Sequence, residues 1–222
     1  MTIQTIAKTP RNTIFQGDCI ATMRRFERGS VDFILTDPPY ITHYRGRDGR
    51  TVANDDNARW LRPAFNQIHR ILKPGGFCVG FYGESKVDLF MDAWRSAGFR
   101  VVGHLVFRKQ YASSSRFLRC EHEQAYLLAK DEVTPPAHPI PDVIDFAYTG
   151  NRLYPTQKPV PALLPLIEYF TRPGDLVLDP FCGSGSTSEA AQQLGRDWLG
   201  VELDERHHAT ASRRLLSLPK VA

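Results

Sequence analysis

Short apolar runs alternate with amphipathic segments along almost the whole chain, and this alternation restricts the possible folds more than any other feature. Runs of the strand type are separated by segments whose apolar residues recur at helical spacing. Continuous apolar strands that alternate with helices predict an α/β fold, in which helices cover both faces of a mostly parallel sheet. The predicted strands are residues 12–16, 30–36, 77–82, 101–107, 124–129, 175–178 and 198–201, and the predicted helices are residues 19–27, 60–72, 85–97, 159–169, 188–194 and 205–216.

The composition fits one globular domain over residues 1–222. Of the 222 residues 42% are hydrophobic and 23% are charged, which supplies a sizeable core and argues against disorder. No apolar stretch approaches the roughly 18 residues of a membrane span, and the N-terminal residues lack the apolar centre of a signal peptide. We therefore expect a cytoplasmic protein without a membrane partner.

The four cysteines show neither the paired spacing of a redox or zinc motif nor a histidine at ligand spacing. We interpret them as the reduced thiols of a cytoplasmic protein, and we expect no metal centre. The cysteines are Cys19, Cys78, Cys120 and Cys182.

A glycine-bearing turn follows one of the predicted strands. Ligands of open α/β sheets bind at the carboxyl ends of strands, and Asp179 stands there, followed by Gly183 and Gly185, which let the backbone approach a ligand. A dinucleotide fingerprint would place a third glycine where Ser188 stands, and a P-loop would need a lysine that the turn lacks. The next strand ends at Glu202, a carboxylate that can accept hydrogen bonds from two ribose hydroxyls. Together these features favour nucleoside binding, whereas the turn alone would also suit a tight connection without a ligand.

A second acidic turn, Asp37-Pro38-Pro39-Tyr40, follows the strand predicted at residues 30–36. Two consecutive prolines fix the backbone and donate no hydrogen bond, so the Asp37 carboxylate and the Pro38 carbonyl become two rigid acceptors. Two fixed acceptors can hold the two N–H donors of an amino group and direct its lone pair away from the ring. Tyr40 offers an aromatic face on which a base can stack, a contact of about 1–3 kcal/mol. A lone tripeptide of this kind would suit a rigid structural turn, so the prediction depends on finding both turns.

The combination of the two turns resembles the amino-group DNA methyltransferases. Residues 36–40 (TDPPY) are similar to their DPPY motif, and residues 179–187 (DPFCGSGST) are similar to their DPFxGSGT cofactor motif. The catalytic motif precedes the cofactor motif, as it does in the β group of these enzymes, and the resemblance covers nearly the whole chain. Further similar elements are residues 17–19 (GDC), 72–76 (LKPGG) and 154–159 (YPTQKP).

The resemblance implies a Rossmann-like fold of the S-adenosylmethionine-dependent methyltransferases, with seven strands and a circularly permuted motif order. In such a fold the strand before Asp18 lies beside the strand that ends at Glu202, although the two come from opposite ends of the chain. The implied cofactor is S-adenosylmethionine.

The resemblance also assigns roles to individual residues. The target base would be held by Asp37, Pro38, Pro39 and Tyr40. Asp179 and the turn from Phe181 to Gly185 would hold the methionine part of the cofactor. Thr156 and Lys158 would approach its carboxylate, Glu202 would bind its ribose, and Asp18 would lie near its adenine. The complete set of implied cofactor residues is Asp18, Cys19, Asp37, Thr156, Lys158, Asp179, Pro180, Phe181, Cys182, Gly183, Ser184, Gly185, Ser186, Thr187, Glu202 and Leu203.

Two features depart from the family pattern. Tyr154 stands where the family usually has histidine, which leaves the role of that position open. Relatives often carry a long target-recognition region at the place of residues 130–153, which here form at most a short insertion. We therefore expect the chain to read a short DNA site, or to read it weakly.

Basic residues cluster in two segments that could face DNA. Positive surface attracts phosphates, although each arginine alone would equally suit a solvated face. Residues 41–57 follow the catalytic turn directly, and we expect them to be mobile without DNA and to close over the substrate. The clustered basic residues are Arg45, Arg47, Arg50, Arg59 and Arg62 in one segment and Arg100, Arg108, Lys109, Arg116 and Arg119 in the other.

The predicted function is site-specific transfer of a methyl group to N6 of adenine in double-stranded DNA, with the target base flipped out of the helix. N4 of cytosine is the first alternative, although cytosine-modifying relatives more often carry serine at the position of Asp37. RNA or a protein glutamine would be a different acceptor, and a DNA-binding module without catalysis is an alternative of another class. By analogy with relatives, a homodimer is also expected.

Overall fold

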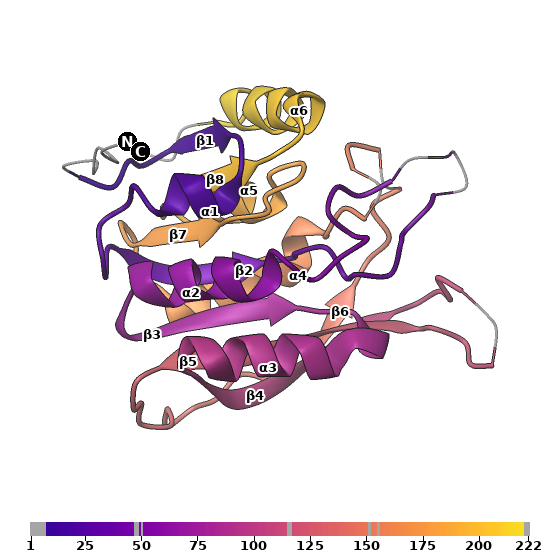
Figure 1. Cartoon of the computed structure of the whole chain (residues 1–222), viewed down its shortest axis with the longest axis horizontal. Helices are drawn as coiled ribbons and strands as arrows, with labels where there is room; N and C mark the ends of the chain where they lie inside the picture. The colour runs from indigo at the N-terminus through magenta and orange to yellow at the C-terminus, as the bar shows by residue number, and fades with distance from the viewer. Residues whose placement is uncertain are drawn as a thin grey trace.

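A computed structural model describes residues 8–46, 49, 51–114, 117–150, 152–154 and 156–219. They form an eight-stranded sheet in the order β1-β8-β7-β2-β3-β5-β4-β6, with helices packed against it (Figure 1). The strands are β1 (Thr13–Gln16), β2 (Val31–Thr36), β3 (Leu72–Phe81), β4 (Phe99–Lys109), β5 (His122–Lys130), β6 (Val143–Phe146), β7 (Leu176–Asp179) and β8 (Asp197–Glu202).

The sheet is mostly parallel, as the apolar strand pattern predicts. β5 pairs antiparallel with both β3 and β4, and the other neighbouring strands in the described residues pair in parallel. The carboxyl ends of seven strands therefore lie at one edge, where the long loops gather at the right of Figure 1.

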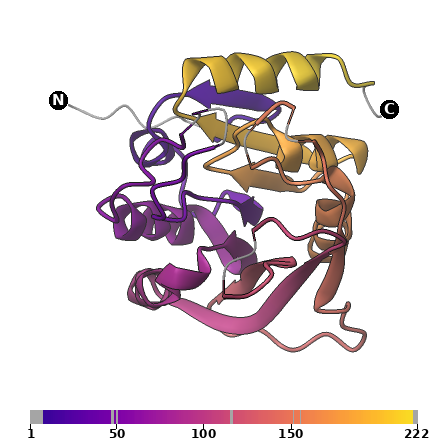
Figure 2. The same ribbon diagram turned by 90° about the vertical axis from the view of Figure 1, so that its right-hand side faces the viewer.

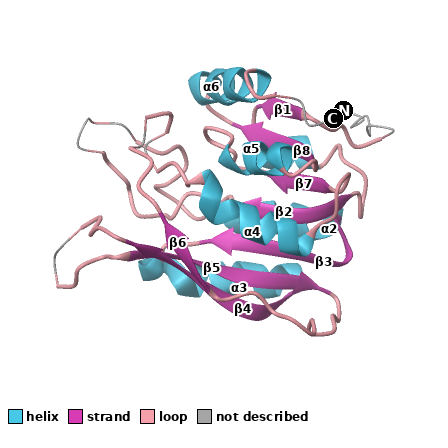
Figure 3. Cartoon of the chain, turned by 180° about the vertical axis from the view of Figure 1, so that it is seen from behind, coloured by secondary structure: helices cyan, strands magenta, loops and turns pink. Residues whose placement is uncertain are grey.

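Helices cover both faces of the sheet. α1, α2 and α3 lie on the face seen in Figure 1, α4 and α5 cover the face seen in Figure 3, and α6 packs along β1 and β8 beside α5. The helices are α1 (Cys19–Met23), α2 (Leu61–Ile71), α3 (Val87–Ala97), α4 (Val160–Phe170), α5 (Ser186–Gln193) and α6 (Glu205–Leu216), and a short 3-10 helix, η1 (Glu84–Lys86), precedes α3.

Two apolar clusters form the core, one on each face. On the α2 and α3 side, Trp94 is fully buried and its ring centroid lies 5.9 Å from that of Phe65. On the α4 and α5 side, Phe81 stacks on Phe107 with 4.7 Å between ring centroids. Each such side chain contributes roughly 1.5–3 kcal/mol by leaving water. Both faces are thus apolar, which explains the continuous apolar runs of the central strands.

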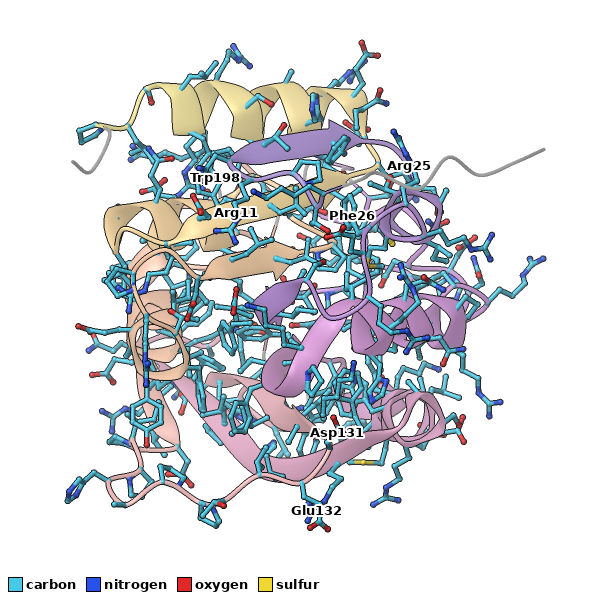
Figure 4. The ribbon with its side chains drawn as sticks, turned by 90° about the vertical axis from the view of Figure 1, so that its left-hand side faces the viewer. Arg11, Arg25, Phe26, Asp131, Glu132 and Trp198 are labelled. Carbon is cyan, nitrogen blue, oxygen red and sulfur yellow. The ribbon has the colours of Figure 1, made fainter. Side chains whose placement is uncertain are left out.

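The predicted pairing between the two ends of the chain is confirmed. β1 runs parallel to β8, with Gln16 opposite Glu202. The residues before β1 reinforce this pair, because Arg11 and Asn12 both hydrogen-bond the carboxylate of Asp197 at the start of β8. Figure 4 shows the side of the molecule on which these contacts lie, with Arg11 near Trp198. The pairing sets Asp18, just after β1, beside the end of β8.

The resemblance implied seven strands, and this number is wrong because the sheet has eight. The additional strand is β6, which lies inside the predicted recognition insertion at residues 130–153 and pairs in parallel with β4. Its sequence, VIDF, is short and follows a proline-rich stretch, so it carried little signal; Phe146 anchors it by packing against Phe107. A recognition role for residues 130–153 stays a prediction.

The LKPGG segment also differs from expectation. The predicted helix ends at residue 72 and the predicted strand begins at residue 77, but the whole LKPGG segment lies within the bounds of β3. The segment bulges out of the pairing with β2. Val31 lies opposite Leu72 and Phe33 lies opposite Phe77, so the residues between Leu72 and Phe77 have only Asp32 across from them. Gly75, with a φ of +71°, permits this bulge.

No helix in the described residues is both long and apolar enough to cross a bilayer. The four cysteines are free thiols, and Cys120 is the most accessible of them. Among the residues that the structure describes, no group of three or more His, Cys, Asp or Glu side chains is arranged to hold a metal ion.

Replacing Asp197 with alanine should destabilise the protein by about 1 kcal/mol, because Arg11 and Asn12 lose their shared acceptor and β1 is held less firmly. Urea unfolding followed by circular dichroism measures the effect. Asp92→Ala is the matched control, since it breaks an ion pair with Arg62 in which both side chains are more than half exposed, and it should change stability by under about 0.5 kcal/mol. Equal midpoints for Asp197→Ala and the unmodified protein would contradict the assigned role.

Candidate active site

A cavity of about 750 Å³ opens at the carboxyl edge of the sheet. Figure 2 looks onto this edge, where the loops after β1, β2, β4 and β8 and the segment before α4 converge. The cavity is lined by the catalytic turn predicted from sequence and by Glu202 on the neighbouring side. A smaller cavity adjoins it and is lined by both Asp37 and Asp179. The two acidic strand ends predicted to share one site therefore do meet.

Asp37 lies at the centre of a buried hydrogen-bond network. One of its carboxylate oxygens accepts from the Tyr40 hydroxyl at 2.8 Å, and the other accepts from Lys158 Nζ at 2.5 Å. Lys158 also lies over the rings of Phe81 and Tyr40, at 4.8 and 5.4 Å from their centroids. These contacts compensate for removing the lysine from water.

Burial raises the pKa of Asp37 above its ordinary value, and the charge and hydrogen bond of Lys158 oppose that rise. The pKa of Tyr40 is also raised, first by burial and then by the carboxylates of Asp37 and Glu123. The Tyr40 hydroxyl therefore stays protonated and donates a hydrogen bond to Asp37.

Glu123 and Lys109 extend this network, although Glu123 was not predicted from the sequence and Lys109 was predicted only as part of a basic cluster facing DNA. Lys109 is buried and forms an ion pair with Glu123, whose other oxygen lies 3.4 Å from the Tyr40 hydroxyl. Burial alone would raise the pKa of Glu123, but Lys158 and Lys109 outweigh burial and bring the pKa below its ordinary value. A signal was present in the alternation of β4, because Leu105, Phe107 and Lys109 share the inward-facing phase.

Asp179 is almost wholly buried where β7 ends. Its carboxylate accepts from the Thr36 hydroxyl at 3.0 Å and from the Phe181 N–H at 3.1 Å. Burial raises the pKa of Asp179 to about 7, and hydrogen bonds from Phe181, Thr187 and Thr36 offset only part of this effect. Unlike Asp37, Asp179 has no cation beside it among the described residues, so a cationic ligand would stabilise its ionised form.

Glu202 closes the other side of the glycine turn. One oxygen accepts from the Gly183 N–H at 2.8 Å, and the other accepts from the Asp204 N–H at 2.9 Å. Gly183 has a φ of +50°, and a Cβ there would come within 3.4 Å of the Tyr154 ring. That ring in turn packs on His207 of α6, with 4.6 Å between centroids. Tyr154, the residue that departs from the family pattern, is therefore part of the support of the turn.

The structure brings most of the predicted site residues to the two cavities. The predicted residues that line the larger cavity are Asp18, Cys19, Asp37, Pro38, Pro39, Tyr40, Thr156, Lys158, Pro180, Phe181, Glu202 and Leu203. Those that line only the smaller one are Asp179, Cys182, Gly183, Ser184, Ser186 and Thr187. Gly185 lines neither cavity. Its φ is +80°, and a Cβ there would meet Ala211 of α6 at 3.3 Å, so Gly185 allows the turn to pack closely against α6.

Basic residues of the second predicted cluster form ion pairs. No acidic residue lies between Arg100 and Arg119 in the sequence, but adjoining strands and turns bring carboxylates beside these side chains. Strand pairing explains these pairs, because β5, β6 and the residues that flank them carry the acids, and a role of the cluster in binding DNA stays a prediction. The pairs are Arg100–Glu132, Arg108–Asp145, Lys109–Glu123 and Arg119–Glu121. Arg47, Arg50 and Arg116 lie outside the described residues, as does Pro155 of the YPTQKP element.

The chain is similar to known DNA methylases over most of its length. The family model described as DNA methylase, of the N6/N4 group, matches residues 31–148 and 144–213. YubD of Escherichia coli (strain K12), a protein that carries a methylase name, is 51% identical over 205 residues, which cover 92% of this chain and 90% of YubD. The type II methyltransferase M.HinfI of Haemophilus influenzae is 24% identical over 255 residues, which cover 92% of this chain and 68% of M.HinfI.

Two solved structures share the fold. The crystal structure of the M1.HpyAVI–SAM complex superimposes with a TM-score of 0.74 at 23% identity, covering 93% of this chain and 99% of that one. The cytosine-N4-specific PvuII DNA methyltransferase superimposes with a TM-score of 0.74 at 16% identity, covering 96% of this chain and 88% of that one. At these identities the likeness establishes the fold alone.

Replacing Lys158 with methionine should destabilise the protein more at pH 8 than at pH 5. The folded-state pKa of Asp37 is already raised and would rise further without the lysine, so folding would require proton uptake across this range. The loss should be about 3 kcal/mol at pH 8, where Asp37 would otherwise be buried as an uncompensated charge, and clearly smaller at pH 5. Urea unfolding at the two pH values measures it, with Lys158→Arg as the variant that keeps the cation. An equal loss at both pH values would show that the pair does not control the ionisation of Asp37.

Proposed function

This chain is a DNA methyltransferase of the N6/N4 methylase family, and on that premise we propose that it transfers a methyl group from S-adenosylmethionine to N6 of adenine in double-stranded DNA. The observation that carries the proposal is the convergence of Asp37 and Asp179 on adjoining cavities, from strands far apart in the sequence. A site for a base amino group and a site for a cationic methyl donor would thereby lie side by side.

The residues at the carboxyl ends of β7 and β8 fit S-adenosylmethionine. Asp179 is a buried acid whose charge lacks a partner cation in the described residues, and the cofactor carries positive charge on its amino group and sulfur. Glu202 is a carboxylate suited to two ribose hydroxyls, and Lys158 lies between the two cavities where a carboxylate could reach it. When bound, S-adenosylmethionine supplies an electrophilic methyl group on its sulfonium.

The catalytic turn would hold the amino group of the target base. A carboxylate has about four acceptor positions, and Lys158 and Tyr40 use two of those of Asp37, so Asp37 can still accept an N–H of the base. The Pro38 carbonyl supplies the second acceptor, and the Tyr40 ring supplies a stacking face. Holding both N–H groups leaves the nitrogen lone pair free to attack, and such alignment can contribute on the order of 7–11 kcal/mol. The base must first leave the helix, at a cost of a few kcal/mol.

Adenine is the proposed target because Asp37, rather than serine, begins the DPPY motif. Cytosine N4 is the second candidate, since its amino group offers the same two donors and the cytosine-N4-specific PvuII enzyme has the same fold. Enzymatic digestion of DNA methylated by this protein, followed by mass spectrometry of the nucleosides, separates the two. N6-methyl-2′-deoxyadenosine is the expected product, and N4-methyl-2′-deoxycytidine alone would overturn the choice of base.

Replacing Asp37 with alanine should reduce methyl transfer by at least about 10²–10³-fold, because the amino group loses its charged acceptor. Binding of S-adenosylmethionine should largely survive, since Asp179 and Glu202 belong to other strands. Transfer of labelled methyl groups to unmethylated genomic DNA measures the first effect, and isothermal titration calorimetry measures the second. Undiminished transfer by this variant would refute the catalytic assignment.

The affinity for S-adenosylmethionine should rise as the pH increases from 5 to 7. In the free protein burial raises the pKa of Asp179 to about 7, so the acid is largely protonated at pH 5. A bound cation favours the ionised form, so binding releases a proton, and the affinity can rise by up to about tenfold per pH unit below that pKa. Calorimetry in buffers with different ionisation enthalpies detects the released proton. Asp179→Asn should bind more weakly and lose most of this dependence; a wild-type affinity that stays constant over the range would argue against the contact.

A further inference from the structure

Asp55 is a buried carboxylate in the segment that follows the catalytic turn, and it was not predicted as a site residue. It is 3% exposed. One oxygen accepts from the Ile41 N–H at 2.7 Å, and the other accepts from the Tyr44 N–H at 2.6 Å. The second oxygen also lies 3.3 Å from both the N–H and the hydroxyl of Thr42. The residues bound by Asp55 therefore begin immediately after Tyr40.

The backbone held by Asp55 is unusual. Ile41 has a φ of +60° and His43 has a φ of +56°, both in the left-handed region. A branched Cβ is strongly disfavoured there, so Ile41 adopts this conformation only because its surroundings impose it. The Asp55 carboxylate accepts from the N–H groups of Thr42 and Tyr44, on either side of His43, and the Asp55 carbonyl accepts from the His43 N–H at 3.1 Å; these hydrogen bonds supply that restraint.

The restrained segment forms part of the cavity wall and contacts both halves of the site. Thr42, Tyr44 and Asp55 line the larger cavity beside Tyr40. On the other side, Trp60 donates to the Asn54 carbonyl at 3.0 Å and packs edge-on against Phe181, with 5.2 Å between ring centroids. Asp55 thus connects the chain leaving the catalytic turn to a residue of the cofactor turn.

Tyr40 itself has little room to move on its other side. A Cβ at Gly83 would come within 2.8 Å of the Tyr40 carbonyl and 2.9 Å of its Cβ, so the strand end of β3 supports Tyr40 closely. Gly83 therefore limits Tyr40 on one side and Asp37 holds its hydroxyl, while the backbone of Tyr40 is further restrained by what holds the residues that follow it.

Only a carboxylate satisfies this arrangement. The donors at Ile41, Thr42 and Tyr44 address both oxygens of Asp55, and an asparagine would present one oxygen and an NH₂ group that cannot accept. Asparagine at position 55 would therefore place its NH₂ group, a donor, against at least one backbone N–H, which is also a donor.

We propose that Asp55 is a positioning residue for methyl transfer, which fixes the backbone after the catalytic turn and so orients Tyr40 and Asp37 toward the target base. This inference rests on the proposed function. Asp55 acts through the backbone and not on the reacting atoms, so its loss should slow the transfer step and leave cofactor binding nearly unchanged.

The test compares Asp55→Asn with Asp56→Asn, its matched control, which makes the same change of charge one residue later at an exposed side chain. Single-turnover transfer of labelled methyl groups to unmethylated genomic DNA should slow by about 10²-fold in Asp55→Asn, as expected for a misplacement of about 1 Å. In Asp56→Asn it should stay within about twofold. The dissociation constant for S-adenosylmethionine should stay within about threefold of wild type in both variants.

Each other outcome has a defined meaning. A wild-type rate in Asp55→Asn overturns the inference, and so does a loss of rate accompanied by an equal loss of cofactor affinity, which a merely structural role would produce. No transfer by the wild-type protein would refute the proposed function instead. If Asp55→Asn does not fold, Thr42→Val and Thr42→Ser decide: the valine variant should be about fivefold slower because it lacks the hydroxyl that faces Asp55, and equal rates would overturn the inference.

Discussion

The parallel pairing of β2 with β7 is the constraint on which the rest of the site depends. Phe33 pairs with Val177 and Ile34 with Leu178, although the strands β3 to β6 lie between these two strands in the sequence. In a parallel pair both carboxyl ends lie at one edge, so the acid after β2 and the acid that ends β7 must be neighbours. The hydrogen bond from the Thr36 hydroxyl to Asp179 joins the two strand ends directly. The pairing of β1 with β8 then sets Glu202 and Asp18 beside them. The pairing of β2 with β7 therefore defines the centre of the site, and the pairing of β1 with β8 extends it.

Asp55 and Asp179 are buried and Asp37 is partly buried within this small region, and each of the three carboxylates is compensated differently. Asp55 is satisfied by backbone N–H groups, which makes it a fixed structural anion. Asp37 is balanced by Lys158 and shares the Tyr40 hydroxyl, so its charge is matched without ligand. Asp179 has hydrogen bonds but no cation beside it in the described residues, and its pKa lies near 7. Burying a charge is unfavourable unless it is paired, so these differences determine which acid can respond to a ligand. Of the three, Asp179 has the most to gain from an incoming positive charge.

The sequence predicted the central features because they are local or repeat along the chain. Apolar runs located seven of the eight strands, and the acids at strand ends followed from the parallel sheet. The remaining features depend on which strands become neighbours. The acids beside the basic cluster could not be predicted, since Glu121, Glu123 and Asp145 come from β5, β6 and their flanks. β6 was missed because a four-residue strand shows its pairing partner only in three dimensions. Asp55 was missed for a related reason. Its partners are backbone N–H groups, which nearly every residue has and which therefore give no sequence signal.

The same distinction explains why the family motifs describe only part of this site. Asp37 and Asp179 stand in recognisable motifs because they are adjacent to prolines and glycines that shape their own turns. Glu123, Lys109 and Asp55 stand in no such motif, yet they contact the motif residues or one another: Glu123 adds to the effect of burial and Asp37 in raising the pKa of Tyr40, Lys109 assists Lys158 in lowering the pKa of Glu123, and the Asp55 carboxylate accepts from the backbone beside Tyr40. A protein that retained both motifs but lost these supports would still be identified as a methyltransferase from its sequence. Its catalytic turn would nevertheless be free to relax, because Ile41 and His43 adopt left-handed conformations that only the surrounding hydrogen bonds maintain. Recognition of the motifs therefore identifies the family, whereas the restraint of the catalytic turn comes from residues that the motifs do not include.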